Sequence, residues 1–233
     1  MAAKLYLIPN AISEDPSAFT IPEYVGNLIG SLRLFFVEDE KSAHRLLKKI
    51  NPKIPLQDCE FQALNEHTPS GDVKAYLERL LRDDAGIISE QGCPCVADPG
   101  ANLVWLAHQN NIEVVPLVGP SSIILALMAS GLNGQNFAFN GYLPKDRPER
   151  SAKIKTLEKR AAQEGQSQIF METPYRNQNI FAELLNSLSA QTKLCVACDI
   201  SGQKQFIHTK TVEDWRKSNI QLPKRPALFI LKG

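Results

Sequence analysis

Short apolar runs alternate with longer amphipathic stretches through the first half of the chain. Apolar residues recur at helical spacing within the amphipathic stretches, and the short runs have the length of buried strands. Strands alternating with helices are typical of βαβ units, so we predict a doubly wound, mostly parallel sheet. The predicted strands are Leu5–Ile8, Leu34–Val37, Phe61–Leu64, Gly86–Ser89 and Ile112–Leu117, and the helices are Glu23–Ser31, Lys41–Ile50, Asp72–Arg82, Asn102–Gln109 and Ser122–Ala129.

The second half has a different order of elements. A tight SGQK turn joins two of its strands, which predicts a hairpin and therefore a mixed or antiparallel sheet. We therefore expect two α/β domains, 1–132 with the parallel sheet and 133–233 with the mixed sheet. The predicted elements are helices at Pro148–Glu164 and Gln178–Ser187, strands at Gln168–Met171, Leu194–Ile200, Gln205–Thr209 and Ala227–Leu231, and a short helix with Thr211 and Asp214 spaced as in a capping box.

Composition limits the class of protein. The chain has 233 residues, of which 43% are hydrophobic, and its longest apolar run, Ile123–Ala129, is too short to span a membrane. The first residues lack a signal-peptide pattern. Five cysteines are an odd number, which favours a reducing compartment over a disulfide framework. We expect a cytoplasmic protein.

Charge is distributed unevenly although the net charge is only +1. Residues 1–131 hold 10 Lys and Arg against 16 Asp and Glu, whereas residues 132–233 hold 16 against 9. The stretch Lys145–Arg160 alone has seven basic and three acidic residues. This asymmetry predicts either an anionic partner such as RNA for the basic half or a solvated surface without a partner.

Several common catalytic motifs are absent from the sequence, including the P-loop, G-x-G-x-x-G, G-x-S-x-G and H-E-x-x-H. Cys93 and Cys95 could join Cys195 and Cys198 as zinc ligands, but a three-residue offset within a strand points side chains to opposite faces. We therefore expect buried thiols and no metal. His67 follows the third strand, where an imidazole could serve acid–base chemistry.

Two Gly/Pro-rich turns follow apolar strands and precede helices. The first contains Gly92, Cys93 and Pro94, and the second runs from Gly119 to Ser122. Strand ends facing helix starts expose backbone N–H and C=O groups, so two such turns predict a site for a polar small molecule. Two ordinary βα turns are the alternative interpretation.

Five ordered segments are similar to a known family: VEDEKSAHRLL, SEQGCPCVADPG, VPLVGPSSIILALMASGL, FNGYLPK and METPYR. On these segments the chain resembles the tetrapyrrole methylase superfamily of S-adenosylmethionine-dependent methyltransferases. Within the superfamily it is most similar to the branch of the ribosomal RNA small-subunit methyltransferases I, which methylate a ribose 2′-oxygen. The resemblance covers nearly the whole chain.

The resemblance implies two α/β domains with S-adenosylmethionine in the cleft between them, and usually a homodimer. It also implies which positions contact the cofactor. They are Pro9, Gly92, Cys93, Pro94, Val96, Gly119, Pro120, Ser121, Ser122, Met171, Glu172, Pro226, Ala227 and Leu228.

Methyl transfer to a hydroxyl requires a group that takes its proton. Candidates are Glu38, Asp39, Glu66, His67 and Glu172, of which we select Glu38, Asp39 and Glu172 as catalytic residues. Arg176 can hold a phosphate or a carboxylate with its guanidinium fork. The predicted substrate contacts are His67, Lys145, Arg147, Tyr175 and Arg176.

The chain departs from the branch pattern in three places. Residues 10–14 replace a Pro-Ile-Gly-Asn-Leu-like loop, Cys93 stands where Thr or Asp is usual, and the sequence ends soon after Leu231. These departures leave two alternatives to an RNA methyltransferase: a methyltransferase acting on a tetrapyrrole or another small molecule, or a catalytically impaired protein that binds S-adenosylmethionine.

Overall fold

The computed structural model describes residues 3–13 and 20–233, which divide into two compact units, one of residues 3–12 and 20–121 and the other of residues 13 and 122–233. Glu14 of the altered first loop lies outside the described residues. The first unit contains β1 (Lys4–Ile8), α1 (Glu23–Ile29), β2 (Leu34–Val37), α2 (Glu40–Ile50), the 3₁₀ turn η2 (Leu56–Asp58), β3 (Glu60–Ala63), α3 (Ser70–Leu80), β4 (Ala85–Ile88), α4 (Ala101–Gln109) and β5 (Glu113–Pro116). The second contains α5 (Ser122–Ser130), β6 (Phe137–Tyr142), α6 (Arg147–Glu164), β7 (Ser167–Glu172), α7 (Asn177–Ser187), β8 (Lys193–Cys198), β9 (Phe206–Thr211), α8 (Val212–Arg216) and β10 (Ala227–Lys232).

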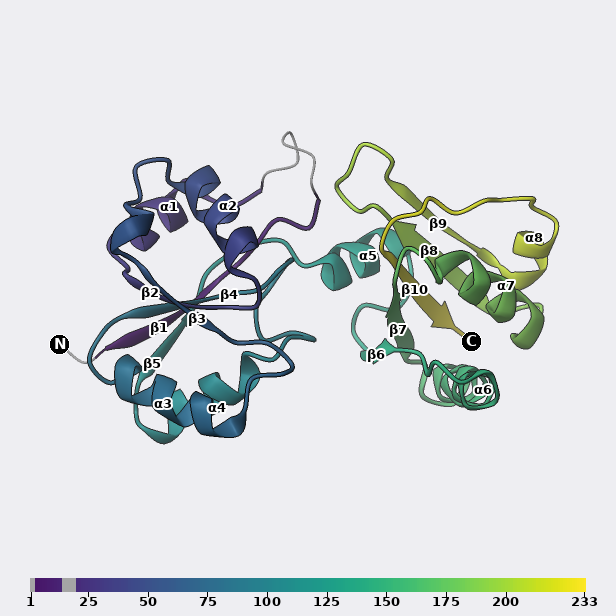
Figure 1. Ribbon diagram of the computed structural model, residues 1–233. Coiled ribbons are helices and arrows are strands. Elements are labelled where there is room, and N and C mark those ends of the chain that lie inside the picture. The colour runs from purple at the N-terminus through teal and green to yellow at the C-terminus, as the bar shows by residue number, and fades with distance from the viewer. Residues whose placement is uncertain (1–2, 14–19) are drawn as a thin grey trace. The chain divides into compact units, whose positions relative to one another are not determined.

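The first unit is a five-stranded parallel sheet in the order β3-β2-β4-β1-β5. Helices cover both of its faces, α1 and α2 on one and α3 and α4 on the other (Figure 1). Val25 and Leu47 pack in the first of the two cores, and Val73 and Leu103 in the second. Because both faces are covered, β2 and β4 are buried along their whole length.

The strand order makes the carboxyl end of β4 a point where the direction of the connecting loops changes. β4 lies between β1 and β2, which lead into helices on the opposite face from α4. The loop after β4 therefore leaves the sheet in the opposite direction from the loops after its two neighbours, and such a change of direction is where doubly wound sheets bind ligands. Ile8 and Val37 both pair with Ile88, so these three strands end at the same level.

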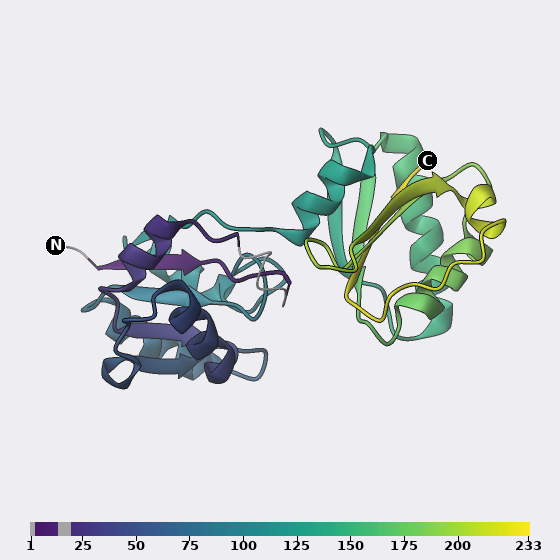
Figure 2. The same cartoon turned by 90° about the horizontal axis from the view of Figure 1, so that it is seen from above.

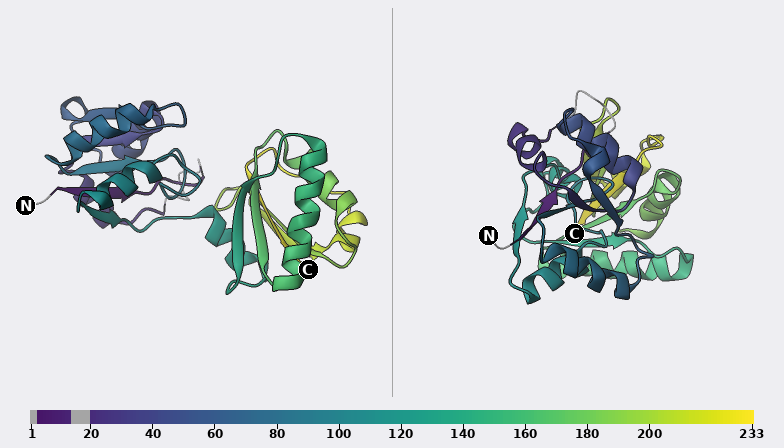
Figure 3. Two further views of the ribbon diagram at one scale, coloured as in Figure 1. Left: turned by 90° about the horizontal axis from the view of Figure 1, so that it is seen from below. Right: turned by 60° about the vertical axis from the view of Figure 1, so that its left-hand side comes forward.

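The second unit is a mixed five-stranded sheet in the order β6-β7-β10-β8-β9. β6 and β7 are parallel and the remaining pairs are antiparallel. Figure 2 shows α5 on one face of this sheet, and Figure 3 shows α6, α7 and α8 on the other. The main core lies under α6, α7 and α8, where Trp215 donates its indole N–H to the Leu194 carbonyl at 2.7 Å.

The predicted α/β class, the parallel first sheet and the mixed second sheet are confirmed, and element bounds differ from the prediction by a few residues. Thr211 caps α8 by accepting from the Asp214 amide, as the spacing predicts.

Cys198 faces the main core whereas Cys195 lies outside it, so the two thiols point to opposite faces of β8. None of the helices in the described residues is both long and apolar enough to cross a bilayer.

Candidate functional site

The carboxyl edge of the parallel sheet gathers most of the predicted site residues of the first unit. Pro9 and Glu38 directly follow β1 and β2, and the turn at Gly92 follows β4. The turn at Gly119 follows β5, the other neighbour of β1. Because β1, β2 and β4 end at the same level of the sheet, their following loops bring together residues that are far apart in the sequence.

Asn10 fastens the end of β1 to the loop after β4. Its buried side-chain amide donates to the carbonyls of Ser89 at 2.9 Å and Glu90 at 2.7 Å. Its backbone amide donates to the Gly92 carbonyl at 2.8 Å, and Gly92 has a φ of +70°, which favours glycine. Three hydrogen bonds thus fix the position of the Gly92 turn.

The Gly119 turn packs directly on Pro9. A Cβ atom on Gly119 would lie 2.1 Å from the Pro9 Cβ, so only glycine allows this approach. The neighbouring Val118 amide donates to the Tyr24 hydroxyl at 3.1 Å, and the Cys93 thiol lies 3.4 Å from the Pro120 carbonyl. The loops after β1, β4 and β5 therefore form one packed edge.

Glu38 occupies a half-buried position beside this edge. Its carboxylate accepts from the Glu90 amide at 2.8 Å and lies against the side chain of Asp98. Burial raises the pKa of Glu38, and the negative charges of Asp98 and Glu90 add to this effect. A carboxylate with a raised pKa has the basicity that proton abstraction near neutral pH needs.

Asp98 holds the loop that contains Val96, an exposed predicted site residue. Its Oδ1 accepts from the amides of Cys95 at 3.1 Å and Gly100 at 2.8 Å. Cys95 and Ala97 have positive φ values of 67° and 58°, so this is a constrained loop. Burial, assisted by Asp98, raises the pKa of the Cys95 thiol to about 12, and burial also raises that of Cys93. Both thiols are therefore protonated at neutral pH.

Two of the predicted residues in the first unit have other surroundings. Asp39 caps α2 by accepting from the Ser42 amide at 2.7 Å, which gives it a structural role. His67 lies after β3, at the edge of the sheet, and its side chain is 86% exposed and lies 3.5 Å from the carboxylate of Glu66. The structure does not bring His67 to the Gly92 turn by any described contact.

A hollow at the amino ends of β2, β3 and β4 contains none of the predicted site residues. Its lining includes Arg33, Arg79 and the carboxylates of Asp58, Glu60, Asp83 and Asp84. Within the described residues, no three His, Cys, Asp or Glu side chains are grouped so as to hold a metal ion.

In the second unit, the predicted residues meet where β7 ends beside the start of β10. Met171 pairs with Leu228 and Glu172 with Ala227. Glu172 is 2% exposed, and its Oε1 accepts from the Thr173 amide at 2.8 Å. Its Oε2 lies 3.1 Å from Nη2 of Arg176 but receives no hydrogen bond from any described residue. A buried carboxylate oxygen with unused acceptor capacity is a candidate contact for a polar ligand.

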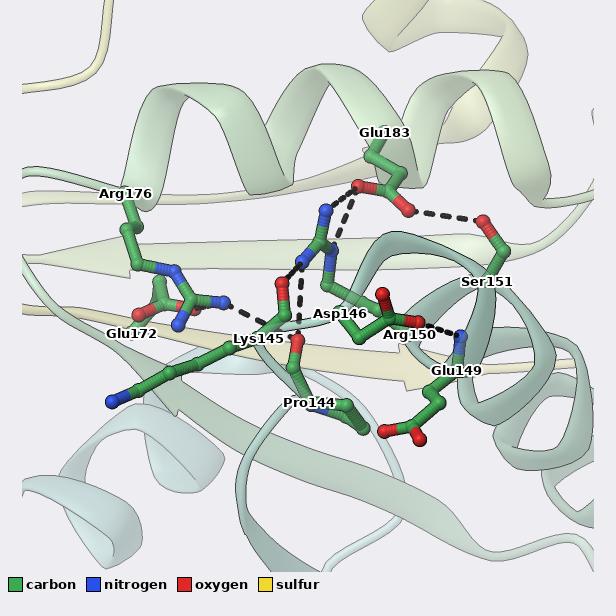
Figure 4. A network of polar contacts seen from close by, with 9 residues as sticks. All are labelled: Pro144, Lys145, Asp146, Glu149, Arg150, Ser151, Glu172, Arg176 and Glu183. Atoms are coloured by element: carbon green, nitrogen blue, oxygen red, sulfur yellow. Dashed lines mark hydrogen bonds and ion pairs between the residues drawn. The ribbon is translucent and has the colours of Figure 1, made fainter.

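The exposed predicted residues surround this strand end. Lys145 and Arg147 lie on the surface at the start of α6, and Tyr175 is 91% exposed before α7. Figure 4 shows Arg176 beside Glu172, with which it forms an ion pair. Ser122 begins α5, and Ser121 precedes it at the division between the units.

Asn177, which the sequence interpretation missed, fixes the segment leading into β10. Its side-chain amide is 1% exposed and donates to the carbonyls of Pro223 at 2.7 Å and Arg225 at 2.9 Å. The neighbouring Gln178 accepts from the Leu222 amide at 2.8 Å. These bonds position Pro226, whose carbonyl accepts from the Asp199 amide at 3.4 Å.

We expect Asn177→Asp to destabilise the second unit by about 3 kcal/mol, because a buried carboxylate would face two carbonyl oxygens without a donor. Urea unfolding followed by the fluorescence of the buried Trp215 measures this change. Asn110→Asp is the matched control, since Asn110 is exposed and donates to one carbonyl, that of Leu106. Equal effects of the two substitutions would contradict the positioning role of Asn177.

Comparisons with known proteins agree with this architecture. No protein-family model matches the chain. The chain is 28% identical to the ribosomal RNA small subunit methyltransferase I of Vibrio cholerae over 83% of its own length and 67% of the relative's. It is 25% identical to the protein of the same name from Pseudomonas aeruginosa, over 92% of this chain and 78% of that one.

A crystal structure of uroporphyrin-III C-methyl transferase from Thermus thermophilus, complexed with S-adenyl homocysteine, has the same fold. Its TM-score is 0.54 at 17% identity, covering 99% of this chain and 97% of that chain. The fold therefore defines the class: a two-unit α/β protein built like the tetrapyrrole methyltransferases. The particular proteins it is similar to in sequence are the ribosomal RNA small subunit methyltransferases I, at 25–28% identity over most of the chain.

Proposed function

We propose that this protein transfers the methyl group of S-adenosylmethionine to RNA, at a ribose 2′-oxygen of ribosomal RNA. The observation that carries the proposal is the similarity, at 25–28% identity over most of the chain, to relatives named ribosomal RNA small subunit methyltransferase I. A ribosomal RNA acceptor also implies activity in the cytoplasm. The superfamily resemblance favours a homodimer.

The packed edge of the first unit suits the methyl donor. Gly92 and Gly119 let backbone approach closely there, and the neighbouring loop ends supply N–H and C=O groups for a polar ligand. We infer that Gly92, Pro94 and Gly119 contact the donor. The superfamily resemblance implies that residues at the ends of β7 and β10 also contact the donor, and Glu172 at that position has an oxygen without a hydrogen bond from the described residues.

The bound cofactor supplies an electrophilic methyl group on a sulfonium. The protein's task is to align the acceptor oxygen with that methyl carbon and to remove the hydroxyl proton. Glu38 is the proposed proton acceptor because it is half buried and its pKa is raised. Asp39 is the weaker candidate, since its carboxylate already caps α2.

The basic surface of the second unit suits an RNA acceptor. Lys145, Arg147 and Arg176 would contact phosphates, which fixes the position of the RNA without reading its sequence. Tyr175, with its ring almost wholly exposed, would stack on an unpaired base. Binding through these cations should weaken as salt rises.

Three measurements test the proposal. We expect calorimetry to detect binding of S-adenosylmethionine and S-adenosylhomocysteine. We expect tritium from a labelled methyl donor to enter small-subunit ribosomal RNA prepared from a strain without the protein. Sedimentation should give a dimer.

Other outcomes decide against this function. Absence of heat with both ligands would exclude the cofactor. Label confined to small molecules would favour a tetrapyrrole or similar acceptor, which the fold shared with a uroporphyrin-III methyltransferase supports. Binding without transfer to any fraction would favour an impaired protein that only holds the cofactor.

A further inference from the structure

Arg150 and Glu183 form a nearly buried ion pair between α6 and α7. Their side chains are 12% and 11% exposed. Nε and Nη2 of Arg150 lie 2.8 Å and 2.7 Å from Oε2 of Glu183, and the Ser151 hydroxyl donates to Oε1 at 3.0 Å (Figure 4). Burying such a pair removes both charges from water, so its Coulomb energy gives little net stability. A packed apolar pair would serve stability equally well.

The remaining nitrogen of Arg150 holds the loop before α6. Nη1 donates to the carbonyls of Pro144 at 3.1 Å and Lys145 at 2.7 Å. All three guanidinium nitrogens are thus in use within the protein. Arg150 therefore has no fork left for a ligand, despite lying in the most basic stretch of the chain.

The same loop borders Arg176. The Pro144 carbonyl lies 3.5 Å from Nη2 of Arg176, which also pairs with Glu172. The side chain of Arg176 is 29% exposed, and its Nε and Nη1 make no hydrogen bond to another described residue. Arg150 thus uses its N–H groups to hold the loop, whereas Arg176 has N–H groups available for an anion.

We propose that Arg150 and Glu183 are positioning residues that hold the Pro144–Lys145 loop so that Arg176 and Lys145 contact a phosphate of the acceptor RNA. This inference rests on the proposed function. A continuous chain of contacts connects them, from Glu183 to Arg150, to the Pro144 carbonyl and to Arg176. Neither positioning residue touches the RNA.

The test compares Arg150→Met, Arg176→Met and the double variant. RNA affinity is measured with small-subunit ribosomal RNA over a range of salt concentrations. The values of kcat and KM are measured with the same RNA. We expect each single variant to weaken RNA binding about tenfold and to lower the salt slope by about one phosphate contact, 0.7–0.9. The double variant should be no weaker than Arg176→Met alone, because both substitutions remove the same contact. Affinity for S-adenosylmethionine should stay within twofold.

Two further variants separate positioning from general stability. Arg160→Met removes the same charge from the far end of α6, where the side chain is 46% exposed, and should change RNA affinity less than threefold. Glu183→Gln keeps the shape of the pair and can still accept from Arg150, so this variant should retain most of the RNA affinity that Arg150→Met loses. If Arg150→Met does not fold, Glu183→Met replaces it in the cycle.

Three results would overturn the inference: an unchanged salt slope in Arg150→Met, additive losses in the double variant, or unchanged RNA binding in Arg176→Met. Binding of the methyl donor is measured on the same wild-type sample. If the wild-type protein does not bind the methyl donor, the proposed function fails. If it binds the donor and Arg150 has no effect on RNA, only the positioning role fails.

Discussion

Gly119→Ala is expected to lower the affinity for S-adenosylmethionine at least tenfold, about 1.4 kcal/mol. The added methyl would lie 2.1 Å from the Cβ and 2.4 Å from the Cγ of Pro9, and a proline ring cannot rotate away. The β5 loop must therefore move from the β1 loop, which Asn10 ties to the Gly92 turn. Overpacking should also destabilise the first unit by about 1–3 kcal/mol. Calorimetry and thermal unfolding measure the two effects.

Gly71→Ala provides the control for this substitution. Gly71 belongs to the same unit, lies in α3, and has no atom within 4 Å of the position that a Cβ would take. Alanine in a helix is favoured over glycine, so this variant should be unchanged or slightly more stable. A folded Gly119→Ala protein with wild-type affinity would show that the methyl donor binds elsewhere.

Glu38→Gln is expected to reduce kcat by about 100- to 10,000-fold, the usual contribution of a general base. The wild-type rate should rise with pH through the raised pKa of Glu38, since only the ionised carboxylate can take a proton. The residual rate of the variant should lack that rise. Affinity for the methyl donor should remain near that of the wild type, because the amide oxygen of Gln can still accept from the Glu90 amide. Rapid-quench single-turnover assays across pH measure the effect.

The same substitution should raise stability at neutral pH. Burial and the charge of Asp98 raise the pKa of Glu38 in the folded state above 4.5, so the folded protein holds this proton to a higher pH than the unfolded chain does. The contribution of Glu38 to stability is therefore lost as pH rises from 4.5 through the raised pKa of the folded protein. Gln carries no charge, so the variant should be more stable than the wild type at pH 7 and equally stable at about pH 3. Lower stability at pH 7, with an unshifted pH–rate profile, would assign Glu38 a structural role instead.

The sequence was enough to predict most of the elements, because the helices have apolar residues at helical spacing and the buried strands are short apolar runs. The buried runs Leu34–Val37 and Ala85–Ile88 are entirely apolar or small, as strands covered on both faces must be. Strand order and register could not be predicted, since they depend on which helix covers which face. Asn10 could have been noticed as a polar residue immediately after an apolar strand, and Asp98 lies in a segment that carries the family resemblance.

The remaining contacts have no signal in the sequence. Arg150 and Glu183 are 33 positions apart, and Asn177 and Arg225 are 48 apart. Each pair meets only because two helices or a helix and a loop pack on the mixed sheet. The sequence of a basic stretch is also the same whether its arginine binds a ligand or holds a loop. Only the geometry distinguishes the role of Arg150 from that of Arg176.

β10 comes last of all the described elements in the chain, yet it lies in the middle of its sheet, between β7 and β8. During synthesis, β7 and β8 emerge from the ribosome with a missing neighbour, whereas all five strands of the first unit have been made by residue 116. The first unit can therefore fold while translation continues. The second can close only after residue 232 has left the exit tunnel, which makes β7 and β8 the segments that need protection from aggregation in the nascent protein.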